Sequence, residues 1–136
     1  MIVMKKTICA FLFFLAFVGV KFFSESLYSE PTQNPNVRYR LFPTPVPFDT
    51  LKLDTATGKI WQIHYDDVND NNNTYVAVLN DKNLAAGKDV SVGRFTLYTS
   101  SNPLAYILID QKDGDTWKLE WSVEDFKWHM SSISTR

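Results

Sequence analysis

At 136 residues, with 45% hydrophobic and 21% charged side chains, the chain has the size and composition of one compact globular domain. Its formal net charge is −1 and it has no basic cluster, which argues against nucleic acid as a partner because phosphate contacts need clustered Lys and Arg. Cys9 is the only cysteine, so a disulfide within the chain and zinc sites with several cysteine ligands are excluded.

Residues 1–26 have the pattern of a secretory signal peptide. Two lysines precede an uncharged run over residues 7–20, which ends at Lys21, and small residues follow. A membrane anchor is the alternative, but a spanning helix needs about 20 apolar residues and this run is shorter. We therefore predict an exported protein, periplasmic, cell-surface or secreted, in which residues 27–37 form a flexible lead to a domain over residues 38–136.

Two segments of this domain, residues 38–66 and residues 94–122, match at a constant offset of 56 residues without a gap. The matched pairs include Leu41 with Leu97, Asp54 with Asp110, Gly58 with Gly114, and Trp61 with Trp117. The matching types fall at the positions that a β-hairpin constrains most. We interpret the two segments as an internal duplication.

Each copy predicts three antiparallel strands. They cover residues 39–42, 50–54 and 59–65 in the first copy, and residues 95–98, 106–110 and 115–121 in the second. In the last strand of each copy apolar and polar side chains alternate, so one side of the strand is expected to face the core. The predicted core residues are Trp61, Ile63, Trp117, Leu119 and Trp121. The same alternation puts His64 on the outer face.

The turns "DTATGK" and "DQKDGD" join the last two strands of each copy. Asp54 and Asp110 suit carboxylates that accept backbone N–H bonds within a turn, and Gly58 and Gly114 suit left-handed backbone positions. We interpret these four residues as structural, because hairpin geometry accounts for them without any chemistry.

Two further segments extend the pattern. "TYVAVL", from Thr74, alternates like a strand, and "SVEDFKWHMSS", from Ser122, is either a final strand or a short helix that Ser122 caps. Together the elements predict an all-β domain in which two three-to-four-stranded antiparallel repeats form one small barrel or sandwich, related by a pseudo-two-fold axis.

The stretch from Arg38 to Ser122 resembles small bacterial exported proteins in which a Leu-Asp-Thr-x-Thr-Gly-x-Ile-Trp hairpin occurs in tandem. The motif reads "LDTATGKIW" in the first copy and "IDQKDGDTW" in the second. The resemblance implies a duplicated β module, and it brings no assigned activity with it.

The segment "DDVNDNNN", residues 66–73, is a candidate calcium loop. Asp67, Asn69 and Asn71 alternate as the oxygen ligands of calcium loops do. No glycine follows them, however, and Val78 stands where an EF-hand has its bidentate glutamate, so a solvated connection is the alternative. Calorimetric titration with calcium distinguishes the two hypotheses.

Two loops at equivalent positions are candidate binding sites for a protein or glycan partner. Their residues are Pro43, Pro45, Pro47 and Phe48 in the first loop, and Asn102 and Pro103 in the second. Proline stiffens a loop, and stiff loops beside an aromatic ring either bind partners or simply cross the end of a barrel.

No nucleophile elbow, metalloprotease helix or phosphate-loop motif occurs in the sequence. We therefore predict a non-catalytic binding or assembly module of the bacterial periplasm or cell surface, without a cofactor unless calcium binds. The alternative is a glycan- or cell-wall-directed hydrolase whose carboxylates are brought together by the fold, and the sequence leaves enzyme activity open. An open sheet edge would pair two copies as a homodimer.

Overall fold

The computed structural model describes Asn34, residues 36–65 and residues 74–134. All regular secondary structure in these residues is β-strand, which confirms the predicted all-β class. No helix in this described part is long and apolar enough to cross a membrane. The predicted signal over residues 1–26 and the candidate calcium ligands Asp67, Asn69 and Asn71 lie outside the described residues.

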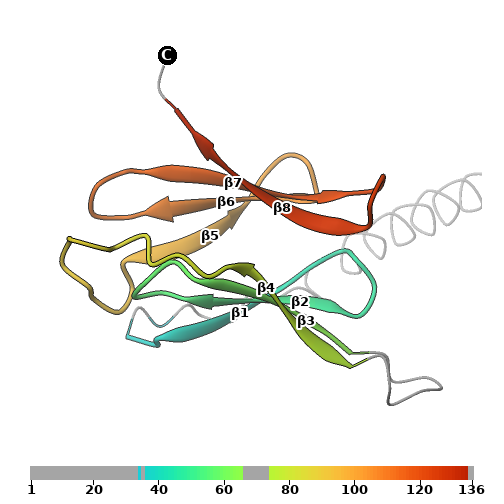
Figure 1. The fold of residues 1–136 in the computed structure, drawn as a ribbon, viewed down its shortest axis with the longest axis horizontal. Coiled ribbons are helices and arrows are strands. Elements are labelled where there is room, and N and C mark those ends of the chain that lie inside the picture. Colours follow the sequence, from blue (N-terminus) through green and yellow to red (C-terminus); the bar gives the residue numbers. More distant parts are fainter. Residues whose placement is uncertain (1–33, 35, 66–73, 135–136) are drawn as a thin grey trace, which may run out of the picture. The chain divides into compact units, whose positions relative to one another are not determined.

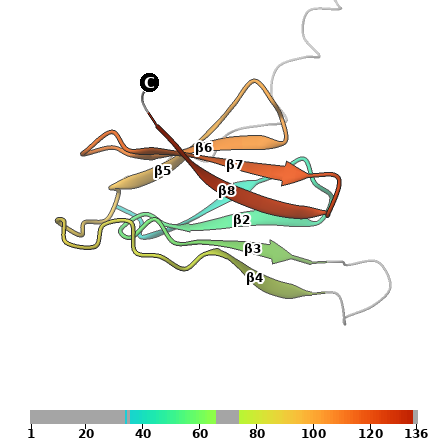
Figure 2. The same ribbon diagram turned by 45° about the horizontal axis from the view of Figure 1, so that its top comes forward.

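The strands form two four-stranded antiparallel sheets, each a meander in which neighbours along the chain pair. The N-terminal sheet consists of β1 (Tyr39–Pro43), β2 (Asp49–Asp54), β3 (Ile60–His64) and β4 (Tyr75–Asn80). The C-terminal sheet consists of β5 (Phe95–Thr99), β6 (Ala105–Asp110), β7 (Thr116–Ser122) and β8 (Lys127–Ile133). The two sheets lie over one another as a sandwich and do not close into a barrel (Figures 1 and 2).

The C-terminal segment is a strand, which decides between the two alternatives that the sequence left open. The Ser122 hydroxyl accepts hydrogen bonds from the backbone N–H groups of Glu124 and Asp125, at 3.2 and 3.4 Å, and so supports a tight turn. After this turn β8 pairs with β7 along its whole length, with Trp128 opposite Trp121. This pairing buries the Trp128 side chain. Removal of a large aromatic ring from water stabilises the folded chain.

The two sheets have the same hairpin registers at positions 56 residues apart. The corresponding pairs are Tyr39 with Asp54 and Phe95 with Asp110, then Asp49 with His64 and Ala105 with Glu120. The turn bonds repeat too, because the N–H groups of Gly58 and Gly114 donate to the carbonyls of Asp54 and Asp110, at 2.9 and 2.8 Å. The same local chemistry therefore builds the same hairpin in each sheet. We call two residues at such corresponding positions equivalent.

The two sheets nevertheless turn opposite faces towards the core. Leu97 is buried, 3% exposed, whereas its equivalent Leu41 is 57% exposed. Conversely, Phe42 is buried and its equivalent Tyr98 is 57% exposed. Since neighbouring residues of a strand point to opposite sides, the sheets stack face to back, as successive layers of a pile do. A two-fold axis would bury equivalent faces, so the predicted pseudo-two-fold symmetry is wrong.

This arrangement also corrects the part of the predicted core that lies in the N-terminal sheet. Trp61 and Ile63 lie on the side of the N-terminal sheet that faces away from the core, because the buried residues of β3 are Ile60 and Gln62. His64 accordingly lies on the inner side, with its side chain 22% exposed, against the prediction of an outer position. In the C-terminal sheet the predicted side is the observed one. There Leu119 is fully buried, and Trp117 and Trp121 pack against the core.

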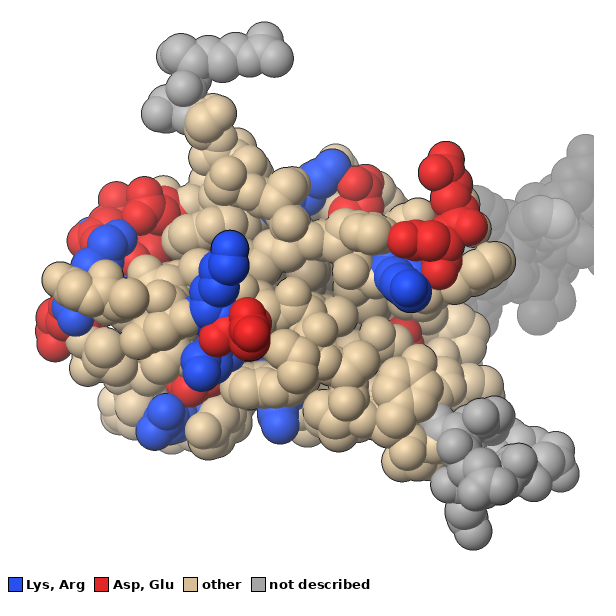
Figure 3. Space-filling view, in the orientation of Figure 1, with Lys and Arg blue, Asp and Glu red and all other residues tan. Residues whose placement is uncertain are grey.

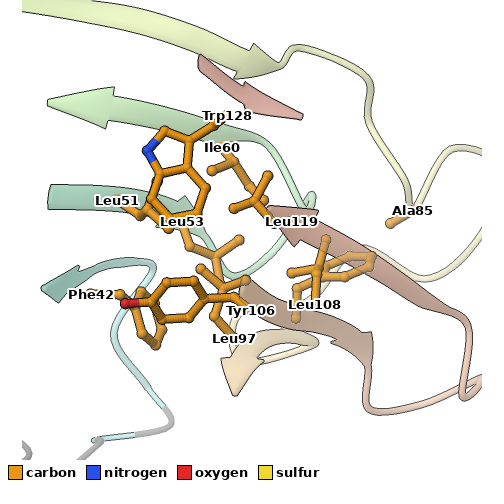
Figure 4. Close-up of a cluster of buried hydrophobic side chains, with 11 residues drawn as sticks. Phe42, Leu51, Leu53, Ile60, Ala85, Leu97, Tyr106, Leu108, Leu119 and Trp128 are labelled. Atoms are coloured by element: carbon orange, nitrogen blue, oxygen red, sulfur yellow. The ribbon is translucent and has the colours of Figure 1, made fainter. Parts of the chain in front are cut away.

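One hydrophobic core fills the space between the sheets (Figure 4). Its buried members from the strands are Phe42, Leu51, Leu53 and Ile60 on one side, and Phe95, Leu97, Tyr106, Leu108, Leu119 and Trp128 on the other. The Trp128 ring packs on the rings of Trp121 and Tyr106, with centroids 5.7 and 5.9 Å apart. Burial of these aromatic rings and of the aliphatic side chains around them favours the joining of the two sheets.

Candidate functional site

The outer face of the N-terminal sheet exposes several large apolar side chains. Its apolar side chains, which alternate with the core residues along β1, β3 and β4, include Tyr39, Leu41, Trp61, Ile63, Val76 and Val78, and β2 contributes Thr50 and Lys52. Leu41, Val76 and Val78 are each more than half exposed, and no other sheet covers them. A single exposed apolar residue is ordinary, but several on one face of a sheet mark a candidate interaction site, here on β1, β3 and β4.

Trp61 is the centre of this outer face. Four cross-strand neighbours form one row that contains it: Leu41, Lys52, Trp61 and Val78. The Tyr39 ring meets the Trp61 ring edge-on, with centroids 6.4 Å apart, and the Lys52 Nζ lies 4.5 Å from the Trp61 ring centroid. These contacts pack Tyr39 and Lys52 on the half-buried indole ring, and the three side chains together offer an aromatic surface to a partner.

A second candidate is the cluster of Asp49, Gln62 and His64 at the inner side of the same sheet. Asp49 and His64 are cross-strand partners, and the Asp49 side chain is almost fully buried. The Asp49 carboxylate lies 2.6 Å from His64 Nδ1 and accepts a 2.8 Å hydrogen bond from Gln62 Nε2. The His64 ring stacks on Tyr75, at 5.0 Å between centroids, and meets Phe48 edge-on.

This cluster resembles the support of a general base, because a carboxylate that bonds one ring nitrogen of histidine sets the orientation of the ring. The other rings packed on His64 are those of Phe48 and Tyr75, and neither side chain carries a carboxylate. The sequence contains one signal for the cluster, the hairpin register that places Asp49 opposite His64. That signal was missed because the wrong face of β3 was assigned to the core.

Three aspartates of the second turn, Asp110, Asp113 and Asp115, have carboxylate oxygens within 4.8 Å of one another. Lys88 Nζ lies 2.8 Å from Asp113 and from Asp115, and 3.8 Å from Asp110. Arg94 lies 2.7 Å from Asp110 and 2.6 Å from Asp113. The two basic side chains therefore already supply the positive charge that a metal ion would bring, and we interpret the cluster as an ion-pair network. Figure 3 shows acidic and basic side chains next to one another on the visible face.

The ion-pair network shifts the titration of its members. Burial favours a raised pKa for Asp110, but hydrogen bonds from Arg94 and from the backbone N–H groups of Lys112 and Asp113 outweigh it, and the pKa is lowered. Hydrogen bonds to Asp113 and Asp115 raise the pKa of Lys88. Both shifts favour the charged forms of Asp110 and Lys88.

Acid is expected to destabilise the domain through Asp110. Its ordinary pKa near 3.8 is lowered in the folded chain, so the unfolded chain binds more protons in this pH range. The stability that Asp110 contributes is present above its unfolded pKa and is lost as the pH falls through its folded pKa. We expect the urea midpoint to hold between about pH 7 and 5 and to fall below about pH 4. Asp110→Asn should weaken this dependence, and a midpoint unchanged at about pH 3 would contradict the assignment.

The predicted turn residues lie in the predicted turns. Gly58 and Gly114 have positive φ angles of 74° and 81°, which only glycine adopts without strain. A Cβ atom at Gly58 would also lie 2.8 Å from Leu84 Cδ1, closer than packing allows. The Asp54 and Asp110 carboxylates each accept a 3.0 Å hydrogen bond from the N–H group two residues on. Each carboxylate also pairs with an arginine, which adds a structural role.

The predicted binding loops lie on the surface at one end of the sandwich. The residues proposed as binding sites are all exposed: Pro43, Pro45, Pro47, Phe48, Asn102 and Pro103. The Tyr106 hydroxyl, just after the second loop, donates a hydrogen bond to the carbonyl of Pro43 in the first. This bond brings the two loops to the same end of the sheets, and binding by these loops stays a prediction.

Comparison with known proteins yields no match, either to a protein family, to a curated protein or to a solved structure. Function must therefore be inferred from the surfaces and contacts of the described residues.

Proposed function

We propose that the protein is a non-catalytic binding or assembly module of the bacterial periplasm or cell surface, and that the outer face of the N-terminal sheet binds its partner. One observation carries the proposal: on β1 and β3 this face has the residue types that the other sheet buries at equivalent positions, yet Tyr39 and Leu41 are more than half exposed. The equivalents of Tyr39, Leu41, Trp61 and Ile63 are Phe95, Leu97, Trp117 and Leu119, which line or pack against the core. A face of this kind gains free energy when a partner removes it from water.

Two further features support the proposal. The equal registers of the two sheets support an internal duplication. The face that the C-terminal copy buries against the core is exposed in the N-terminal copy. The signal-like pattern of residues 1–26 supports export. We place the module in the cell envelope on these grounds.

The hydrolase alternative has less support. Glycoside hydrolysis needs two carboxylates about 5 to 9 Å apart that are free to act. Among the described residues, the clustered carboxylates of Asp110, Asp113 and Asp115 are held by Lys88 and Arg94. The buried carboxylate of Asp49 is likewise held by Gln62 and His64. These bonds tie the acidic groups to structural roles.

A photo-crosslinking amino acid at Val78, on the outer face, tests the proposed function in cells that produce the protein. We expect a crosslinked species from Val78, and none from a matched control at Val123, which is equally exposed but lies in the turn before β8. A crosslink to any polypeptide, including a second copy, supports a binding or assembly module. If Val78 gives no crosslink while the protein is folded and exported, the outer face is not a binding surface and the proposal is wrong.

A further inference from the structure

We infer that copies of this chain stack head to tail, with the outer face of the N-terminal sheet of one molecule packed on the outer face of the C-terminal sheet of the next. This inference rests on the proposed function, since it names the partner of the same surface. The evidence is the way in which the two sheets of one molecule already pack, because that packing serves as a template for the contact between molecules.

Within one molecule the sheets pack face to back. If the sheets are viewed as two equivalent layers, the inner side of the C-terminal sheet corresponds to the outer side of the N-terminal sheet, as Leu97 and Leu41 show. A face-to-back contact joins two different sides of the layer, so it leaves two different sides uncovered at the ends of the pile. These are the outer faces of the two sheets.

The outer face of the N-terminal sheet is equivalent to the inner face of the C-terminal sheet, which already packs on a neighbouring sheet. Its central row is Leu41, Lys52, Trp61 and Val78, and the equivalent row of the C-terminal sheet is Leu97, Leu108, Trp117 and Ser132. The latter row packs towards the core, where Leu97 and Leu108 are buried and Trp117 lies against Phe95 at 6.3 Å between ring centroids. The two rows share their leucine and their tryptophan, so the outer row keeps the two largest apolar residues of a row that a second sheet covers.

The outer face of the C-terminal sheet is equivalent to the inner face of the N-terminal sheet, on which that row packs. Tyr98, Ile107 and Ile109 are the equivalents of Phe42, Leu51 and Leu53, the buried residues on which the C-terminal sheet sits. Tyr98 is more than half exposed, and Ile107 and Ile109 are half-buried although no further sheet lies above them. An aromatic ring and two β-branched residues therefore present an apolar receiving surface.

The two free faces of a molecule are therefore complementary to each other and not to themselves. A contact between unlike faces is heterologous, and it leaves one face of each kind free at the ends, so it can continue through further copies. A self-complementary dimer, in contrast, would consume one face type and stop. The structure thus predicts a ladder of oligomers in place of a closed pair.

Polar substitutions within the two faces make this contact weaker than the internal one. Lys52 stands at the position of Leu108, and Lys118 and Glu120, which pair at 2.6 Å, stand at the positions of Gln62 and His64. These charges must lose water when the faces meet, which reduces the free energy gained on contact. We expect association that is reversible and depends on protein concentration.

Sedimentation velocity on the purified chain tests the inference with two variants that each block one face. Leu41→Lys with Val78→Lys blocks the N-terminal face, and Tyr98→Lys with Ile133→Lys blocks the C-terminal face, in each case at exposed positions on the two edge strands. We expect the wild type to give dimers, trimers and larger species as the concentration rises. Each variant alone should stay monomeric.

An equimolar mixture of the two variants is the decisive measurement. One variant retains its C-terminal face and the other its N-terminal face, so the mixture should form a species of twice the monomer mass and nothing larger. The control Val123→Lys with Phe126→Lys removes exposed apolar side chains in the turn before β8, away from both faces, and should keep the wild-type ladder. Unchanged melting temperatures of the variants show that the faces, not the fold, have been altered.

Two results would overturn the stacking. If the variant with the blocked C-terminal face still dimerises alone, the N-terminal faces pair with each other. If the wild type stays monomeric at all concentrations while Val78 crosslinks to a different polypeptide in cells, the outer face binds another partner, and the proposed function survives without the stacking. If Val78 gives no crosslink either, the proposed function fails as well.

Discussion

Leu97→Ala is expected to lower the free energy of unfolding by about 2 to 5 kcal/mol, whereas Leu41→Ala at the equivalent position should change it by less than about 0.5 kcal/mol. Leu97 is 3% exposed and removing its side chain leaves a cavity between the sheets, while Leu41 is 57% exposed and its removal leaves none. Two leucines that hold the same place in their hairpins thus differ only in which side of the sheet is covered.

Urea unfolding of both variants measures this difference. The measurement belongs at low protein concentration, so that self-association through the outer face does not add to the apparent stability of the wild type. Equal losses for the two variants would show that both faces are buried alike, and the face-to-back packing of the sheets would be wrong. A pair of variants at Phe42 and Tyr98 reverses the roles of the two sheets, because there the first residue is the buried one.

Arg94→Met is expected to lower the melting temperature by more than about 10 °C, and Arg38→Met by a few degrees at most. The two arginines are equivalent, and each pairs with the aspartate of its turn. The Arg94 and Asp110 side chains are both buried, so loss of the arginine leaves an unpaired carboxylate away from water. The Arg38 side chain is 54% exposed, so water can replace much of its contact with Asp54.

Differential scanning calorimetry of the two variants checks this prediction, and a double variant tests its cause. Adding Asp110→Asn to Arg94→Met removes the uncompensated charge but keeps an oxygen that can accept the turn N–H bonds, so part of the lost melting temperature should return. A double variant that melts below Arg94→Met alone would mean that the carboxylate itself, and not its lost partner, controls the stability of the turn.

The strands and turns followed from local patterns in the sequence. Alternation and turn residues placed β2 and β6 within a residue of their observed limits, and the aspartates and glycines of both turns have their predicted conformations. These features depend on neighbours a few residues away, so they form in the hairpin whichever of its faces packs on another sheet. Local pattern could not choose between strand and helix for β8, because that choice depends on the pairing of β8 with β7.

The Asp49 and His64 pair shows what local patterns cannot predict, namely which face of a strand is buried. The two residues meet because a hairpin register sets them opposite each other, and this register is implicit in the turn. Their burial is not implicit, since it depends on which side of β3 is covered. Trp61 was assigned to the core on the same assumption, and it lies instead on the outer face that we propose as the binding surface.

The amino-acid sequence by itself determined the all-β class, the two hairpin units and their turns, because alternation and turn chemistry act within a few residues. Only the tertiary structure decided which face of each unit is buried. Both faces of the N-terminal sheet are apolar enough to pack, with Leu51 and Leu53 on one side and Leu41 and Trp61 on the other. The C-terminal sheet covers the first and leaves the second in water, because a sheet with two apolar faces can bury only one against a single partner layer.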